Sequence, residues 1–127
     1  VEFYYKDDAL GDPFLSDDQA LMLQAASSRA ELDELRAAAL KINKILQSVF
    51  TAGGLELIDF KLEFGRDQKG QMMLADEISP DTCRLWDSKT GERLDKDRFR
   101  RDLDRIEEAY QEVLKRIQNV LGKGAVK

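Results

Sequence analysis

The chain has 127 residues, of which 20 are lysine or arginine and 25 are aspartate or glutamate, so its net charge is −5. This length fits one small domain, residues 1–127, with a single core, and the acidic balance argues against a nucleic-acid partner. The chain has no histidine and one cysteine, Cys83, which excludes histidine-dependent triads, histidine zinc sites and internal disulfides. No stretch is typical of a signal peptide or membrane span, so we expect a cytoplasmic protein with no membrane partner.

The N-terminal region predicts short elements. Residues 1–5 form an apolar and aromatic run that is typical of a strand, and Gly11 and Pro13 mark the loop that follows it. Ser16 is followed by two aspartates. This pattern predicts a helix start, because acidic side chains favour the positive end of the helix dipole, and the helix should continue to about Ala26.

Two long amphipathic helices are predicted, because apolar residues recur every three or four positions. A capping box at residues 28–31 begins the first helix, and a glycine pair at residues 53–54 ends it. Either Asp95 or Asp97 begins the second helix, which ends at two glycines near the C-terminus. The two apolar stripes are Leu32, Leu35, Ala39, Ile42, Leu46 and Val49, and Phe99, Leu103, Ile106, Tyr110, Val113, Leu114, Ile117 and Leu121.

Residues 55–76 predict a β-hairpin, because apolar and charged residues alternate before a tight turn at residues 67–70. The expected core face is Ile58, Phe60, Leu62 and Phe64, and the expected ionic face is Asp59, Lys61 and Glu63. If residues 67–70 form a four-residue turn, Glu63 faces Leu74 and Lys61 faces Asp76. The carboxylates of Glu63 and Asp76 then lie on one face as diagonal neighbours, roughly 7–8 Å apart at the backbone.

Two carboxylates at that spacing can hold one hard cation. A one-residue change of register would move Asp76 to the opposite face. The alternative is an ordinary solvated strand face that carries a Lys61–Asp76 ion pair. Directly after the hairpin, Asp76, Glu77 and Asp81 crowd a segment that Pro80 stiffens, and Arg84 follows. This arrangement suits a site for Mg²⁺ together with a phosphate or carboxylate.

The predicted fold is therefore α+β, with an antiparallel β-hairpin or small sheet packed by two long amphipathic helices. A further cluster of basic residues precedes the last helix, interleaved with aspartates, and we interpret it as a solvated helix face. It consists of Lys96, Arg98, Arg100, Arg101 and Arg105.

The sequence resembles the SAICAR synthase (phosphoribosylaminoimidazole-succinocarboxamide synthase) family in four blocks that occur in the same order. These are residues 6–13 (KDDALGDP), 59–65 (DFKLEFG), 75–87 (ADEISPDTCRLWD) and 94–100 (LDKDRFR). The resemblance covers essentially the whole chain but corresponds to about the C-terminal half of the family's enzymes. It implies the C-terminal lobe of their ATP-grasp or kinase-like fold. We expect that the N-terminal, ATP-covering lobe is missing, and a first residue of Val1 fits a chain that starts within a longer protein.

The resemblance also implies an activity. Family enzymes use ATP and Mg²⁺ to join L-aspartate to carboxyaminoimidazole ribotide through an acyl phosphate, giving SAICAR, ADP and phosphate in purine biosynthesis. Phosphoryl transfer depends on positioning and charge neutralisation, which fits a site without histidine. We expect the isolated chain to have little ligase activity and to form a homo-oligomer or require the missing lobe.

The roles of individual residues follow from the same resemblance. The implied catalytic residues are Lys61 and Asp81, the ATP-binding residues are Lys61, Glu63 and Asp76, the Mg²⁺ ligands are Glu63 and Asp76, and the substrate-binding residues are Lys6, Asp12, Ser79, Asp81 and Arg84. One departure is the pair Asp104 and Arg105, where family members should have glycines and where we expect the last helix.

Two other hypotheses remain open at this point. A non-enzymatic interaction module predicts no binding of Mg²⁺ or nucleotide. A different ATP-using transferase with the same half-fold predicts nucleotide binding without a response to the ribotide.

Overall fold

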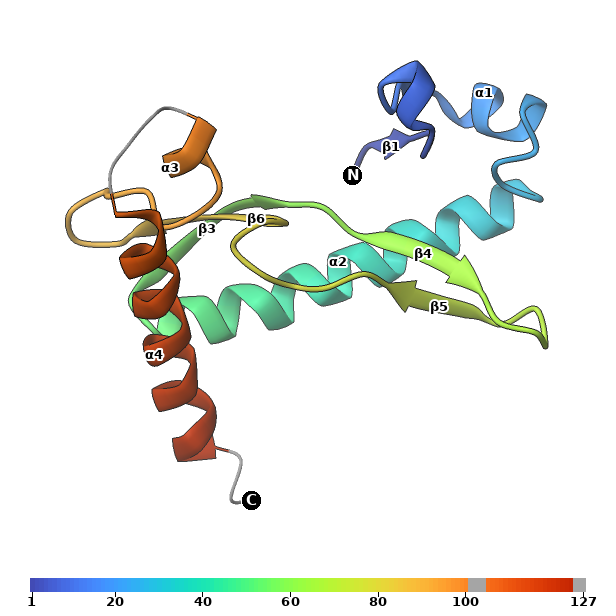
Figure 1. Cartoon of the computed structure of the whole chain (residues 1–127). Coiled ribbons are helices and arrows are strands. Elements are labelled where there is room, and N and C mark those ends of the chain that lie inside the picture. Colours follow the sequence, from blue (N-terminus) through green and yellow to red (C-terminus); the bar gives the residue numbers. More distant parts are fainter. Residues whose placement is uncertain (101–104, 125–127) are drawn as a thin grey trace. The chain divides into compact units, whose positions relative to one another are not determined.

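The computed structural model describes residues 1–100 and 105–124 and has an α+β fold (Figure 1). Within the described residues, three separate antiparallel sheets have two strands each and pair β1 with β2, β3 with β6, and β4 with β5. The elements in chain order are β1 (Phe3–Tyr4), the 3₁₀ helix η1 (Asp8–Leu10), β2 (Phe14–Leu15), α1 (Asp17–Met22), α2 (Arg29–Ala52), β3 (Leu55–Phe60), β4 (Glu63–Arg66), β5 (Met72–Ala75), β6 (Cys83–Asp87), α3 (Asp97–Arg100) and α4 (Ile106–Gly124).

Contacts divide the chain into two compact units, Val1–Lys44 and Ile45–Lys127. Each unit has its own cluster of buried apolar side chains, where the sequence predicted a single core. The expectation of a single domain stays a prediction. In residues 1–100 and 105–124, no helix combines the length and apolar character needed to cross a bilayer.

The first unit contains two short strands and the start of α2. β1 pairs with β2, a strand that the sequence did not predict. Helix α1 begins where expected, because Ser16 and Gln19 form a reciprocal capping box, but it ends at Met22 and not near Ala26. The buried side chains of this unit are Leu15, Ala20, Ala26 and Leu32.

Helix α2 confirms the first long helix. The N–H of Glu31 donates to the hydroxyl of Ser28 at 3.1 Å, as a capping box requires. At its other end, Gly54 has a φ of 71°, the left-handed conformation that favours glycine after a helix. The residues that begin and end this helix were therefore readable from the sequence.

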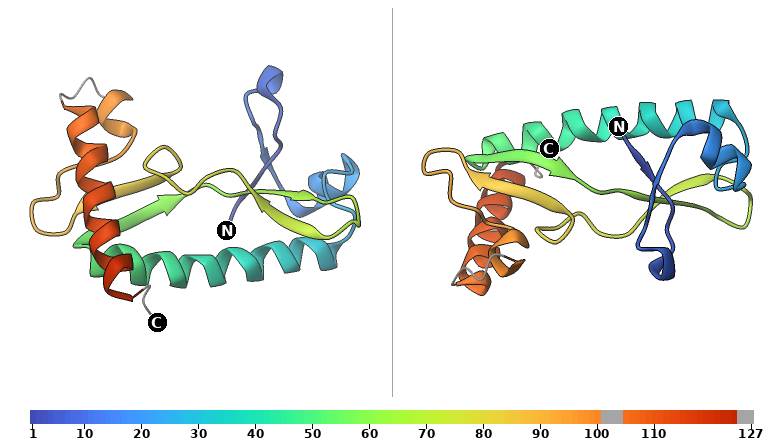
Figure 2. Two further views of the ribbon diagram at one scale, coloured as in Figure 1. Left: turned by 60° about the horizontal axis from the view of Figure 1, so that its bottom comes forward. Right: turned by 90° about the horizontal axis from the view of Figure 1, so that it is seen from above.

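The core of the second unit lies on the β3–β6 sheet, whose strands run side by side in both views of Figure 2. Both long helices contribute to it, as predicted, but Leu114 (49%) and Leu121 (50%) of the expected second stripe are exposed. Within the described residues, this cluster contains no residue of β4 or β5. The buried members are Phe50, Leu55, Cys83, Leu85, Leu94, Ala109 and Val113.

Of the four expected core residues of the hairpin, Ile58, Leu62 and Phe64 do not belong to the core cluster of the second unit, and only Phe60 packs against it. The register of β3 against β6 shifts between Leu57 and Asp59, so that Ile58 is an extra residue in a β-bulge and is 39% exposed. The bulge returns Phe60 to the core side of the sheet. A prediction from strict alternation of inward and outward side chains fails here, because it assumes a β-ladder without a bulge.

The hairpin forms between β4 and β5, but its register differs from the prediction by one residue. Glu63 pairs with Ala75, and Arg66 pairs with Met72. The reason is the turn: the N–H of Asp67 donates to Gln71 O at 2.9 Å, so the loop has three residues and not four. The Asp67 carboxylate accepts N–H groups from Lys69 and Gln71, both at 2.8 Å, and stabilises this loop.

The segment before α4 also differs from the prediction, because α3 and α4 are separate helices. Asp95 is completely buried and accepts the N–H groups of Leu85 (2.7 Å) and Asp97 (2.8 Å), so it caps α3. Burial raises the pKa of its carboxyl. The expected solvated face is wrong at Arg98, which is 6% exposed and pairs with Glu92 at 2.6 Å. Three residues of the earlier predictions, Arg101, Leu103 and Asp104, lie outside the described residues.

Arg105 directly precedes α4, so it lies outside the predicted last helix, and it has a φ of 60°. This left-handed conformation is costly for a residue with a Cβ and favours glycine. The departure from the expected family glycine therefore falls at a backbone conformation that favours glycine.

We expect Arg105→Gly to raise the free energy of unfolding by about 1 kcal/mol relative to Arg105→Ala. Both variants lose the 3.9 Å contact with Glu108, but only glycine relieves the backbone. Urea denaturation of both variants measures the difference, and equal stabilities would contradict the prediction.

Candidate functional site

The expected metal ligands lie at the open end of the hairpin. Glu63 pairs with Ala75, so Asp76 is the next residue along the opposite strand. With this register, strict alternation would send the Asp76 side chain to the face opposite Glu63. Asp76 has a φ of 77°, however, which breaks the alternation. The predicted register, in which Glu63 faces Leu74, is therefore wrong. That Glu63 and Asp76 converge on one metal ion stays a prediction.

A positive φ at a non-glycine residue costs free energy and often occurs at functional sites. Among the described residues, four such positions occur, and two of them, Asp12 and Asp76, are predicted site residues. Asp76 Oδ1 accepts the N–H of Glu77 at 2.9 Å, a local bond that helps to hold this conformation. A hydrogen bond to its own side chain thus contributes to holding the positive φ of Asp76.

Lys61 forms an ion pair with the Glu63 carboxylate. Its Nζ is 3.0 Å from Glu63 Oε1, and the Lys61 side chain is 61% exposed, whereas that of Glu63 is 20% exposed. A largely exposed cationic side chain thus lies next to a half-buried carboxylate. This combination can bind a phosphate group and its metal ion together.

Mg²⁺ usually takes one or two protein carboxylates and completes its shell with phosphate oxygens and water. Within residues 1–100 and 105–124, no three carboxylate or thiol side chains gather as a ready-made metal cluster. Glu63 and Asp76, two carboxylates flanking the hairpin end, fit a donor set of the magnesium–nucleotide kind.

Ser79 and Asp81 lie in a compact turn between β5 and β6. The N–H of Ser79 donates to Thr82 Oγ1, and the N–H of Asp81 donates to Ser79 Oγ, both at 3.1 Å. The N–H of Cys83 donates to Ser79 O at 2.9 Å. The hydroxyl of Ser79 therefore stabilises the turn. At the end of the turn, burial raises the pKa of the Cys83 thiol.

Arg84 is held by two carboxylates that we did not include in the predicted site. Its Nη1 is 2.8 Å from Asp59 Oδ2, and its Nε is 3.1 Å from Asp97 Oδ2. Asp59 chiefly, and then Asp97, raises the pKa of the guanidinium. Asp59 is the cross-strand partner of Arg84 in the β3–β6 ladder, so only the register could have revealed it. Both acids do lie in the sequence blocks that carry the family resemblance.

The remaining two predicted residues, Lys6 and Asp12, belong to the first unit. Asp12 Oδ1 accepts the N–H of Asp7 at 2.9 Å and closes the loop around η1. Their participation in the same site as Glu63 and Arg84 stays a prediction.

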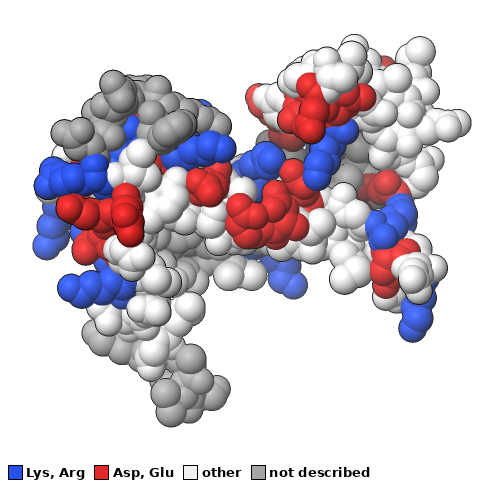
Figure 3. Space-filling view, in the orientation of Figure 1, with Lys and Arg blue, Asp and Glu red and all other residues white. Residues whose placement is uncertain are grey.

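Figure 3 shows acidic and basic side chains of the described residues interspersed over the face in view.

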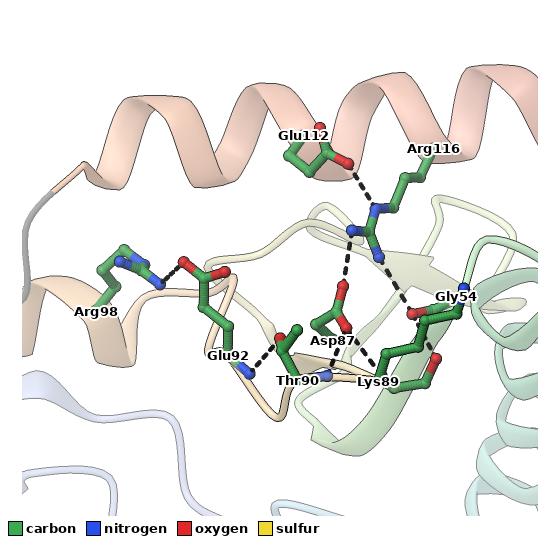
Figure 4. Close-up of polar contacts among 9 residues, drawn as sticks. Gly54, Asp87, Lys89, Thr90, Glu92, Arg98, Glu112 and Arg116 are labelled. Atoms are coloured by element: carbon green, nitrogen blue, oxygen red, sulfur yellow. Dashed lines mark hydrogen bonds and ion pairs between the residues drawn. The ribbon is translucent and has the colours of Figure 1, made fainter.

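A second polar cluster in the second unit is structural (Figure 4). Arg116 of α4 lies 2.7 Å from Asp87 Oδ2 and from Glu112 Oε1, and it donates to Gly54 O at 3.2 Å. Backbone N–H donation by Thr90, together with Arg116, holds the pKa of Asp87 far below its usual value. A cavity of about 250 Å³ beside this network is lined in part by Gly54, Asp87 and Arg116, which already bind one another.

Comparison with known proteins identifies the family to which the chain belongs. The family model for SAICAR synthetase matches residues 1–117. The chain belongs to the SAICAR synthetase family. This confirms the resemblance seen in the sequence blocks.

Individual relatives agree with this assignment. The chain is 60% identical over 119 residues to the phosphoribosylaminoimidazole-succinocarboxamide synthase of Wolinella succinogenes, covering 94% of this chain and 50% of that protein. It is 58% identical over 120 residues to the synthase of Listeria monocytogenes, covering 94% and 50%. The chain thus spans about half the length of the curated relatives it matches.

Solved SAICAR synthetases share the fold. One, in complex with ADP, superposes with a TM-score of 0.88 at 49% identity, covering 94% of this chain and 50% of that chain. The enzyme of Pyrococcus horikoshii OT3 gives a TM-score of 0.87 at 48% identity, with coverages of 94% and 51%. These similarities confirm the α+β fold class.

Proposed function

We propose that this chain forms the metal–nucleotide and ribotide-binding half of an ATP-dependent ligase that makes SAICAR in purine biosynthesis. The observation that carries the proposal is the hairpin end, where Glu63 lies 3.0 Å from Lys61 Nζ and pairs with Ala75, the residue before Asp76. Membership of the SAICAR synthetase family and similarity to a member solved with ADP support the choice of ATP.

The proposed reaction begins with an unreactive carboxylate on the ribotide. ATP transfers its γ-phosphoryl group to that carboxylate, which gives an acyl phosphate and ADP. The amine of L-aspartate then attacks the acyl carbon, and phosphate leaves. Mg²⁺, held by Glu63 and Asp76, would neutralise the phosphate oxygens, and Lys61 would contact the transferring group.

Arg84 and the nearby turn suit the second substrate. Because Asp59 and Asp97 fix the guanidinium from two sides, Arg84 presents its remaining N–H donors in a defined direction. In the proposal, Arg84, Ser79 and Asp81 bind the ribotide, and Lys6 and Asp12 help to orient substrate.

We further propose that ligation requires the rest of the family's sequence. The chain spans about half of its relatives, and the hairpin exposes Met73 (53%) and Leu74 (44%). Such apolar side chains favour docking of another polypeptide part or of a second copy. We place the reaction in the cytoplasm, where the free thiol of Cys83 would stay reduced.

The test is calorimetric titration with carboxyaminoimidazole ribotide. We expect Arg84→Ala to weaken ribotide binding at least tenfold, about 1.4 kcal/mol, because a charge-assisted hydrogen bond is lost. Arg29→Ala is the matched control, since Arg29 is 64% exposed and makes its ion pair with Asp18 in the other unit. Unchanged affinity in Arg84→Ala, or no ribotide binding by the wild-type chain, would contradict the proposal.

A further inference from the structure

One side chain of α4 contacts the turn that carries Asp81. The hydroxyl of Tyr110 donates a hydrogen bond to Asp81 Oδ1 at 2.7 Å. We propose that Tyr110 is a positioning residue, which orients the Asp81 carboxylate toward a ligand hydroxyl group. This inference rests on the proposed function, because it assumes that Asp81 contacts the ribotide.

The position of Tyr110 is fixed by the core beneath it. Its ring packs against the core cluster of the second unit, and its neighbours on α4, Ala109 and Val113, are 5% and 4% exposed. The helix therefore cannot rotate without opening the core. A phenol anchored in this way is a rigid donor with few rotatable bonds.

The backbone of the turn is held independently of Tyr110. Asp81 donates its N–H to Ser79 Oγ, and Pro80 O accepts the N–H of Lys96, both at 3.1 Å. The Asp81 side chain itself is exposed. Without the tyrosine hydroxyl, the turn would keep its shape while the carboxylate sampled several rotamers.

The hydrogen bond also leaves the carboxylate asymmetric. Tyr110 occupies Oδ1, whereas Oδ2 has no hydrogen bond or ion pair with the described residues. A carboxylate with one oxygen engaged and the other open is suited to accept a hydrogen bond from a ligand hydroxyl, such as one on a ribose ring. A phosphate group would be repelled by it.

The experiment compares Tyr110→Phe with Tyr4→Phe by calorimetric titration with the ribotide and, separately, with MgADP. Tyr4 is a matched control, because its hydroxyl also donates to a carboxylate, Glu2 Oε2, at 2.8 Å, but in the other unit. We expect Tyr110→Phe to weaken ribotide binding roughly 3–10-fold, from renewed side-chain freedom, and to leave MgADP binding unchanged. Tyr4→Phe should bind both as the wild type does.

Two further variants separate positioning from a general structural effect. In an Asp81→Ala background, adding Tyr110→Phe should cause no further loss of ribotide affinity, because the group to be positioned is gone. Wild-type affinity in Tyr110→Phe, an equal loss for both ligands, or an additive loss in the Asp81→Ala background would each overturn the positioning role. A wild-type chain that binds no ribotide would instead overturn the proposed function, and the inference with it.

Discussion

Replacing Asp95 with asparagine is expected to lower the free energy of unfolding by about 3 kcal/mol, the largest stability effect that the structure indicates. Asp95 is completely buried and accepts one N–H with each oxygen, from Leu85 and from Asp97. An asparagine side chain would place an NH₂ donor against one of those N–H groups. The buried strand β6 and the start of α3 would then lose a shared anchor.

Urea denaturation of wild type and Asp95→Asn measures this loss, with Asp33→Asn as the control. Asp33 is an exposed carboxylate whose pair with Arg36, at 3.4 Å, lies on the helix surface, so its loss should change stability by about 0.5 kcal/mol or less. Equal stability of Asp95→Asn and the control would contradict the role assigned to Asp95.

The pH dependence gives a second check on the same carboxylate. Burial raises the pKa of Asp95 in the folded chain, so the unfolded chain ionises first as the pH rises. The free energy of unfolding of the wild type therefore falls as the pH rises past the pKa of the unfolded Asp95 carboxyl. The asparagine variant has no carboxyl to ionise at this position, so its stability does not show this fall. The cost of the substitution should shrink as the pH rises above about 4 toward neutrality.

Removing either proposed metal ligand should weaken Mg²⁺-dependent nucleotide binding roughly 10–100-fold, or about 1.4–2.7 kcal/mol. The suitable variants are Glu63→Gln and Asp76→Asn. Asparagine tolerates the positive φ at position 76, so that variant should keep the fold. Each variant removes one charge from a pair of carboxylates that would share the ion.

Titration with ADP in the presence and absence of Mg²⁺ measures this effect, with Glu56→Gln as the control. Glu56 is exposed on β3 and lies opposite Trp86, away from the hairpin end. We expect the control to bind MgADP as the wild type does. Loss of binding in Glu56→Gln equal to that in Asp76→Asn would show that the effect is a general change of surface charge.

The helices were the most predictable part of the fold, because their signals are local. The Ser16 and Ser28 caps and the glycine pair after α2 are fixed by residues within one helical turn, and the structure shows all three. The turn at residues 67–70 was also found, since Asp67 and Gly70 determine it locally.

The strand details were less predictable, because they depend on pairing between distant residues. The bulge at Ile58 arises from the fit of β3 to β6, and a three-residue loop where four were assumed shifts the whole hairpin by one position. The separate helix α3 depends on Asp95, whose burial no local pattern indicates.

The same distinction applies to the site. Glu63 and Asp76 are brought together by a hairpin of short sequence separation, so their proximity was predictable, although the face of Asp76 was not. The partners of Arg84 were missed, because Asp59 reaches it across the sheet and Asp97 reaches it from α3. Tyr110 was predicted only as a core residue, yet its hydroxyl reaches Asp81.

The central claim is that this chain carries binding sites for both a magnesium nucleotide and the ribotide. Calorimetric titration of the wild-type chain with MgADP, followed by carboxyaminoimidazole ribotide, tests it most directly. The account predicts saturable ribotide binding in wild type and in Asp76→Asn, with MgADP binding weakened only in the variant. Heats equal to those of dilution for both ligands would contradict the claim and favour a folded interaction module without a ligand site.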